Sequence, residues 1–241
     1  DDKTEVTKWT YNTKIPSYGA TGWWDKSAYK EGMVLGDIWG LQFDRFLTED
    51  DFNADGSLKA GLPDQTKVFP AGYQFAPGDV LYKDLDNNGE IVKQTNTNDK
   101  GDLSVIGNAL PRLQFGLNLD AAWKGFDISM FFQGVAKRKL WAAGNQVLPG
   151  FTTGEPFYKG AEDYWTPENT DAFYPRPMDY KQSASGNYSV NDRYLLNMAY
   201  LRLKTFTVGY SLPKVWLSKF KVQGLRVYFT GENLFTIDGV K

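Results

Sequence analysis

The chain has 241 residues, a formal net charge of −2, no histidine and no cysteine. The missing cysteines exclude a disulfide framework and a thiolate metal site, and the missing histidines exclude a Ser-His triad and most zinc sites. The near-neutral charge argues against nucleic acid as a partner. Aromatic residues are abundant, with 8 Trp, 14 Tyr and 16 Phe, yet no run approaches the roughly 20 apolar residues of a transmembrane helix. This composition fits a secreted β-protein or an outer-membrane barrel, whose strands are apolar at alternate positions.

The first part of the chain carries only weak strand patterns. Residues 5–12 and 34–47 alternate imperfectly, and 48–110 is a long polar stretch rich in Asp, Asn and Gly. We expect two weak strands followed by a long loop.

The clearest strand pattern covers 111–124. Apolar residues occupy every second position, and every second side chain of a strand lies on the same face of the sheet: Leu113, Phe115, Leu117, Leu119, Ala121 and Trp123. Soluble strands are usually about 5–6 residues long, whereas a strand that crosses a bilayer needs roughly 9–11. The length therefore favours a membrane.

The next strands follow in chain order. A tight turn at Lys124-Gly125 leads into a strand at 126–140, so that 111–140 is predicted to form a long antiparallel hairpin. A second long loop, 141–193, precedes a strand at 194–212. There the apolar parity changes, which requires either a β-bulge near Lys204-Thr205 or a strand covered on both faces.

The end of the chain completes the pattern. A short connector at 214–224 precedes a last visible strand at 225–235, and the chain stops at 238–241, where we expect a loop before one further strand. Trp123, Phe126, Tyr210 and Trp216 lie near predicted strand ends, where interfacial aromatic belts occur.

Connection lengths alternate between tight turns and loops of roughly fifty to sixty residues, which is unusual in a compact domain. An outer-membrane barrel has this alternation, with short periplasmic turns and long extracellular loops. With about six strands, fewer than the eight of the smallest such barrels, the chain cannot close a barrel alone. The prediction is an all-β fold: a partial transmembrane antiparallel β-barrel with 48–110 and 141–193 as extracellular loops.

Eight segments resemble, in order and spacing, signatures of the SusC/RagA family of TonB-dependent outer-membrane transporters of Bacteroidetes. They are PGDVLYKDLDNNGEI at 77–91, IGNALPR at 106–112, KGFDISMFFQG at 124–134, YWTPENT at 164–170, YPR at 174–176, YLRLK at 200–204, GYSLP at 209–213 and GENLF at 231–235. Each is weak alone, and the resemblance covers about residue 32 onward, matching the C-terminal part of the family's barrel domain.

The resemblance implies a barrel of about 22 strands with an N-terminal plug. Such a transporter lies in the outer membrane, between lipid and lipopolysaccharide, and is energised through TonB. A SusD-like surface lipoprotein delivers glycans or peptides for nutrient uptake, as in polysaccharide utilisation. The plug, the TonB-binding segment and the terminal strand have no counterpart in residues 1–241, so transport itself is an expectation taken from the family.

Two acidic loops have the opening of an EF-hand-type calcium site, in which oxygens at positions one, three and five surround the ion and a glycine at six permits the turn. The first loop offers Asp84, Asp86, Asn88 and Glu90, with Asp99 or Asp102 in place of the missing twelfth ligand. The second offers Asp51, Asn53 and Asp55. Ordinary surface turns have the same composition, so Ca²⁺ is a hypothesis here and no other cofactor is expected.

Aromatic residues in the long loops are candidates for contact with substrate or partner, because apolar sugar faces stack on aromatic rings. They are Trp141, Tyr158, Tyr164, Trp165, Phe173 and Tyr174. The alternative is that these rings pack within the loops or against the lipoprotein.

Two other functions remain open. A secreted β-sandwich that binds carbohydrate would use the same aromatic residues, but it would bury Leu113, Phe115, Leu117 and Leu119 between two sheets. A glycosidase needs only two carboxylates, but the sequence does not identify such a pair. We therefore expect no enzyme.

Overall fold

The computed structural model describes residues 32–93, 99–142, 144, 146–151, 157–178 and 186–240. The weak strand predicted at 5–12 lies outside these residues. The chain divides into two units, each described by itself. The first, here called the sheet unit, comprises Pro111–Arg138 and Asn197–Lys241; the second, the loop unit, comprises Lys3–Leu110 and Lys139–Leu196.

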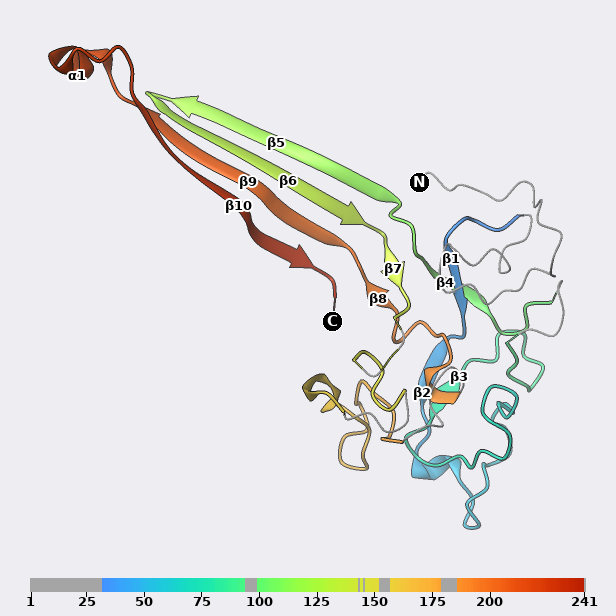
Figure 1. Cartoon of the computed structure of the whole chain (residues 1–241). Coiled ribbons are helices and arrows are strands. Elements are labelled where there is room, and N and C mark those ends of the chain that lie inside the picture. Colours follow the sequence, from blue (N-terminus) through green and yellow to red (C-terminus); the bar gives the residue numbers. More distant parts are fainter. Residues whose placement is uncertain are drawn as a thin grey trace. The chain divides into compact units, whose positions relative to one another are not determined.

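The sheet unit is built on one antiparallel sheet with the strand order β10-β9-β6-β5 (Figure 1). Its strands are β5 (Leu113–Trp123), β6 (Phe126–Ala136), β9 (Tyr200–Ser211) and β10 (Arg226–Asp238). Strands of 11 residues are about 36 Å long, and at a tilt of about 45° they span about 25 Å, the height of the apolar band of an outer-membrane barrel. The all-β prediction is confirmed.

The predicted hairpin is confirmed, with β6 ending at Ala136 rather than at residue 140. β5 and β6 pair without irregularity from Leu113↔Ala136 to Trp123↔Phe126. The turn between them has positive φ at both residues, 47° at Lys124 and 91° at Gly125. Two positive φ angles are typical of the type I′ turn, whose twist matches that of the paired strands.

The predicted bulge also exists, and it lies at Lys204. β6 pairs Phe131 with Thr205 and Phe132 with Leu203, so Lys204 has no partner on β6. On the other side, Glu232 of β10 pairs with Thr205 and Phe235 with Leu203, which leaves two residues of β10 opposite Lys204. Relative to β6, β9 therefore has one additional residue at this point and β10 has two.

This bulge keeps one face of the sheet apolar on all four strands. In register across the sheet, Leu117 pairs with Phe132, which pairs with Leu203, which pairs with Phe235. The row nearest the turns runs through Trp123, Phe126, Tyr210 and Val227. If Lys204 paired regularly instead of forming the bulge, the Leu201 end of β9 would turn its apolar side chains to the opposite face.

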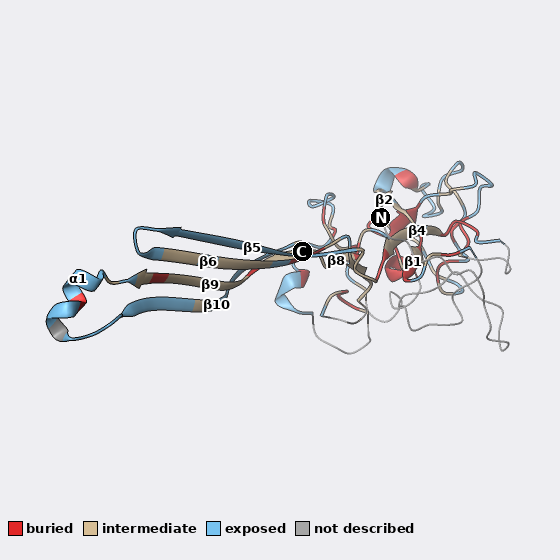
Figure 2. Ribbon diagram, turned by 90° about the horizontal axis from the view of Figure 1, so that it is seen from above, coloured by how far each residue is buried: buried red, intermediate tan, exposed pale blue. Residues whose placement is uncertain are grey.

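The apolar residues of the edge strands are exposed: β5 and β10 are coloured as exposed and β6 and β9 mostly as intermediate (Figure 2). Relative exposure is 51% for Leu113, 42% for Phe115, 49% for Leu117 and 43% for Leu119. A β-sandwich would bury these side chains, so this sheet is not half of a sandwich.

The opposite face carries polar pairs. Arg226 donates to the carboxylate of Asp127 with Nε–Oδ1 at 3.1 Å, and its second contact is a short ion pair. Thr207 shares a hydroxyl hydrogen bond of 2.5 Å with Thr230. The sheet therefore separates an apolar face from a hydrogen-bonding face, the alternation that characterises a barrel wall.

The connector between β9 and β10 is partly helical, with α1 (Lys214–Leu217) followed by the 3-10 turn η6 (Ser218–Phe220). β10 then extends to Asp238, three residues beyond the predicted end at 235. Among the described residues, no helix is long and apolar enough to cross a membrane.

The loop unit corrects the expectation for the first part of the chain. The strand expected at 34–47 is two short strands, β1 (Asp37–Gly40) and β2 (Phe43–Phe46), which pair with different partners. β1 pairs with β4 (Ser104–Asn108) and β2 with β3 (Val80–Tyr82). β3 and β4 lie within the segment expected to be loop. Within the part of the chain that the structure describes, the strands of membrane-spanning length are the four of the sheet unit.

The expected strand at 194–212 is also shorter, because its first residues belong to other elements. Tyr194 is buried in a cluster with Leu148 and Tyr188. Leu196–Asn197 forms β8, which pairs with β7 (Lys139–Leu140). The continuous strand β9 therefore begins only at Tyr200.

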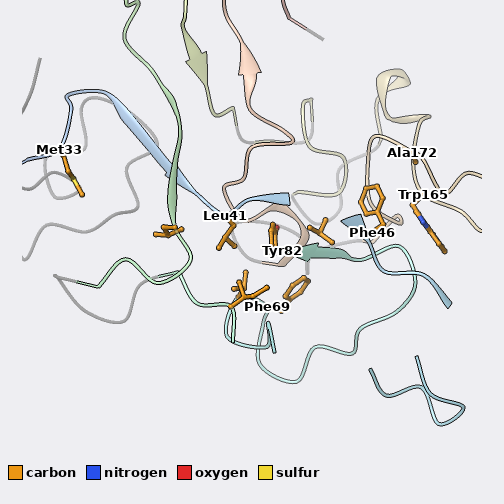
Figure 3. Close-up of a cluster of buried hydrophobic side chains, with 11 residues drawn as sticks. Met33, Leu41, Phe46, Phe69, Tyr82, Trp165 and Ala172 are labelled. Carbon is orange, nitrogen blue, oxygen red and sulfur yellow. The ribbon is translucent and has the colours of Figure 1, made fainter. Parts of the chain in front are cut away.

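The predicted long loops have a hydrophobic core of their own (Figure 3). It brings together buried side chains from residues 33–46 and from both predicted loops: Met33, Leu41, Phe46, Val68, Phe69, Val80, Tyr82, Ile91, Leu103, Trp165 and Ala172. Tyr82 is 1% exposed, and its hydroxyl donates to the carbonyl of Gly186 at 2.8 Å. Segments about a hundred residues apart are thus packed into one folded unit.

Candidate functional site

An aromatic pocket of about 430 Å³ lies in the loop unit. Its lining combines aromatic rings and prolines with one lysine and one glutamate: Pro149, Phe157, Tyr158, Lys159, Ala161, Glu162, Tyr164, Tyr174, Pro175, Pro177 and Tyr188. A concave, mainly apolar surface with a few polar groups is the usual form of a small-molecule or peptide site.

Three of the six aromatic candidates, Tyr158, Tyr164 and Tyr174, meet in this pocket. Tyr158 and Tyr164 are 46% and 40% exposed, so their rings are available to a ligand. Tyr164 forms a β-bridge with Tyr174, which places these two residues side by side. Burial, and after it the charge of Asp163, raises the pKa of Tyr174 above the ordinary value for a tyrosine.

The other three candidates pack inside the loop unit. Trp165 is 6% exposed and belongs to the hydrophobic core. Phe173 and Trp141 are half-buried against the cluster around Tyr188 and Tyr194. Their positions match the packing alternative, and direct contact with a ligand stays a prediction for the three pocket tyrosines.

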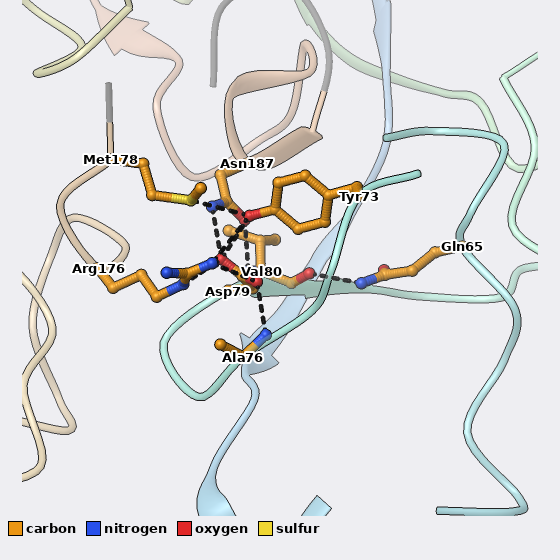
Figure 4. Close-up of polar contacts among 8 residues, drawn as sticks. All are labelled: Gln65, Tyr73, Ala76, Asp79, Val80, Arg176, Met178 and Asn187. Atoms are coloured by element: carbon orange, nitrogen blue, oxygen red, sulfur yellow. Dashed lines mark hydrogen bonds and ion pairs between the residues drawn. The ribbon is translucent and has the colours of Figure 1, made fainter. Parts of the chain in front are cut away.

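A buried aspartate, which the sequence did not single out, holds one wall of the pocket (Figure 4). Asp79 is 0% exposed and pairs with Arg176, with Nε–Oδ1 at 2.8 Å, between the pocket prolines 175 and 177. The same carboxylate accepts from the Tyr73 hydroxyl at 2.8 Å and from the Asn187 amide at 3.0 Å. A buried carboxylate with this many donors fixes the chain segments that supply them.

A second arginine fixes the segment just before Tyr174. Arg193 donates to the backbone carbonyls of Ala172 at 2.6 Å and Phe173 at 2.8 Å. Its guanidinium lies 4.3 Å from the ring centroid of Phe43 and 5.0 Å from that of Phe46. These contacts anchor the pocket segment to β2 through cation–π and hydrogen-bond interactions.

The first acidic loop brings three carboxylates together. One oxygen each of Asp84, Asp86 and Asp102 lies within 4.8 Å of the others. Gly89 takes φ of 86°, as a glycine at position six of a calcium loop requires. The candidate twelfth ligand is thus Asp102; Asp99 is outside the cluster and accepts from the backbone N–H of Gly101.

The electrostatics of this cluster suit a cation. Desolvation and the neighbouring carboxylates of Asp102 and Asp84 raise the pKa of Asp86, whereas the backbone N–H of Gly89 lowers the pKa of Asp84. Two of the remaining predicted residues are engaged within the loop: Asn88 accepts from the backbone N–H of Glu90 at 2.7 Å, and the Glu90 carboxylate pairs with Lys67. Three hard oxygen ligands in one loop fit Ca²⁺, with backbone carbonyls and water available for the rest.

The second acidic loop is arranged differently. Both carboxylate oxygens of Asp51 accept from Arg45, at 2.6 and 2.7 Å, which lowers the pKa of Asp51 to about 2. Asn53 donates to Ser57, and Asp55 accepts from Ser57. Because an arginine and a serine already use these groups, we restrict the calcium hypothesis to the first loop.

Comparison with known proteins gives two similar sequences. TonB-dependent receptor P3 of Formosa agariphila is 29% identical over 213 residues, which is 86% of this chain and 18% of that protein. TonB-dependent receptor P26 of the same organism is 34% identical over 153 residues, or 62% of this chain and 14% of that protein. No family model matches the sequence.

The fold has a solved counterpart. A structure of the RagAB peptide transporter superposes with a TM-score of 0.53 at 17% identity, covering 86% of this chain and 19% of the matched chain. The chain thus spans less than a fifth of the length of each of these proteins. These relatives are receptors and transporters rather than enzymes.

Proposed function

We propose that this chain, which is a segment of a SusC/RagA-like TonB-dependent transporter, supplies four adjacent strands of the barrel wall and a folded extracellular unit. The intact transporter lies in the outer membrane and imports glycans or peptides. A SusD-like lipoprotein covers it from outside, TonB energises it, and membrane lipid and lipopolysaccharide surround the wall.

The observation that carries this proposal is the apolar face of the sheet unit. It is in register on all four strands; its side chains are exposed on the edge strands β5 and β10, with Leu117 at 49% and Phe229 at 60%, and mostly half-buried on β6 and β9. Monomeric soluble proteins rarely expose contiguous apolar patches larger than a few hundred Å². In lipid, such a face contacts acyl chains and carries no free-energy penalty for exposing apolar surface to water.

The test uses the full-length transporter in its own host. We expect the protein in the outer-membrane fraction, co-purification of a surface lipoprotein encoded beside it, and uptake of labelled oligosaccharide or peptide that stops when the TonB-binding segment is deleted. Uptake that survives this deletion, or a protein found outside the membrane fraction, contradicts the proposal.

We further propose that the aromatic pocket contacts the imported ligand. Tyr164→Ala is expected to weaken binding by roughly three- to tenfold, the size of one lost ring contact. Tyr164→Phe keeps the ring of this exposed residue (40%) and serves as the matched control. The measurement is the affinity of the purified full-length transporter for the ligand, determined by calorimetry for wild type and both variants. Equal affinities for wild type and Tyr164→Ala would rule out ring contact.

For the first acidic loop, we propose a structural calcium ion held by Asp84, Asp86 and Asp102. Asp86→Asn is expected to lower calcium affinity at least tenfold, measured as bound calcium after dialysis of the full-length protein. Asp86 is the preferred position because it is exposed, whereas Asp102 also accepts from the backbone N–H groups of Leu85 and Val92. Asp55→Asn in the second loop is the control and should leave calcium binding unchanged. If wild type and Asp86→Asn retain the same calcium, the loop is an ordinary acidic turn.

A further inference from the structure

The turn that joins β9 to β10 is an ordered structure rather than a loose loop. Leu212 donates its N–H to the carbonyl of Leu225 at 2.9 Å, which closes the turn at its base. Within it, the N–H of Val222 donates to the carbonyl of Leu217 at 3.2 Å, and the Leu217 side chain is only 5% exposed. Leu217 therefore anchors the turn from inside, and residues 213–216, 218–219 and 221–225 are exposed.

Those outward side chains combine apolar and cationic groups. Val215 is 75% exposed and Trp216 60%. Residues 212–225 also contain three exposed lysines, at 214, 219 and 221, and no aspartate or glutamate. An exposed tryptophan beside several lysines is costly in water but suits a membrane interface, where the ring enters the headgroup layer and the ammonium groups reach lipid phosphates.

The same end of the sheet carries a second set of such groups. Trp123, Phe126 and Tyr210 form one row across three strands, and the rings of Phe126 and Tyr210 have centroids 4.4 Å apart. The ammonium of Lys124, in the β5–β6 turn, lies 4.7 Å from the ring centroid of Trp123. The apolar face thus ends in an aromatic row with a cation beside it, at the same sheet end as the β9–β10 turn.

We propose that the β9–β10 turn binds the phosphate headgroups of anionic phospholipids in the leaflet at the short-turn side of the barrel. Val215 and Trp216 enter the acyl–headgroup boundary, and Lys214, Lys219 and Lys221 contact the phosphates. Two features together favour lipid as the occupant. The turn continues the apolar face of the sheet, and its positive charge has no carboxylate within residues 212–225 to compensate it. This inference rests on the proposed function, because it requires the sheet unit to lie in a bilayer.

The test measures lipid selectivity of the full-length transporter in bilayer nanodiscs. Spin-labelled phosphatidylglycerol is compared with spin-labelled phosphatidylcholine, and the ratio of their association constants is determined. A lysine near an anionic surface contributes about fivefold to binding, so the variant K214Q/K219Q/K221Q should lose most of the preference for phosphatidylglycerol at that site. High salt should reduce the preference of the wild type in the same direction.

The matched control is K59Q/K83Q/K100Q, which removes the same charge from exposed positions of the loop unit. It should keep the wild-type preference. An unchanged preference in K214Q/K219Q/K221Q, or an equal loss in the control, overturns the inference, as does a turn that binds an acidic protein while showing no lipid preference.

Heat-modifiable migration on gels reports whether the barrel has folded, and it distinguishes failure of the proposed function from failure of this inference alone. If the wild-type barrel does not form in the bilayer, the proposed function fails. If the barrel forms but shows no preference for anionic lipid, only this inference fails.

Discussion

Replacement of Leu117 by arginine is expected to prevent most of the transporter from folding into the membrane. Leu117 is near the middle of β5, and its row continues through Phe132, Leu203 and Phe235 without a polar residue. A charge on the lipid-facing side costs about 2–4 kcal/mol at the bilayer midplane. The measurement is the fraction of full-length protein that shows heat-modifiable migration in outer-membrane preparations.

Asn118→Arg is the control for this experiment, because the neighbouring position places the same side chain on the opposite face of the same strand. It should fold nearly as well as the wild type, since that face carries polar pairs such as Thr207 with Thr230. Equal folding of Leu117→Arg and Asn118→Arg would mean that the apolar face does not contact lipid.

Replacement of Asp79 by alanine is expected to loosen the loop unit, including the proline wall of the pocket. The change leaves the half-buried guanidinium of Arg176 without its carboxylate and removes the acceptor of Tyr73 and Asn187. Breaking a buried ion pair by removing one partner typically costs about 3–5 kcal/mol. Amide hydrogen exchange of the full-length transporter should become faster in peptides covering 64–82 and 173–178, and ligand binding should weaken with it.

Two controls make this result specific. Asp79→Asn keeps an acceptor oxygen and the side-chain shape, so it should lie between wild type and Asp79→Ala. Asp50→Ala removes an exposed aspartate from the same unit and should leave exchange unchanged. Unaltered exchange in Asp79→Ala would show that the carboxylate is not what holds the wall.

The long hairpin and the bulge could be predicted because their causes are local. A period of two and a Lys-Gly turn are visible in one stretch of sequence, and the parity change around Lys204 is explained either by a bulge or by a strand covered on both faces, of which the structure has the bulge. The strand expected at 34–47 was wrong because alternation does not reveal that the chain changes partners between Gly40 and Phe43, from β4 to β3.

The candidate site depends on contacts between distant residues, and these leave no periodic signal. Asp79 and Arg176 meet across 97 positions, and nothing nearby in the sequence marks either as a partner. Nothing in the sequence distinguishes Trp165 from its neighbour Tyr164 as a candidate for ligand contact. In the structure, Trp165 is in the hydrophobic core, whereas Tyr164 lines the pocket. For the acidic loop, the sequence offered Asp99 and Asp102 equally as the missing ligand, and only the fold distinguishes them, because it brings Asp102 to Asp84 and Asp86.

The bulge at Lys204 implies that β9 carries one residue more than its pairing with β6 uses. Lys204 has no partner on β6, so replacing its side chain would disturb little of the pairing. Deleting the residue would make Leu203 follow Thr205 directly, as Phe132 follows Phe131 on β6, so Leu201 and Leu203 would stay on the lipid side and Arg202 on the other. The bulge thus lets β9 accommodate an additional residue without exchanging its two faces, which a scan of substitutions would not reveal.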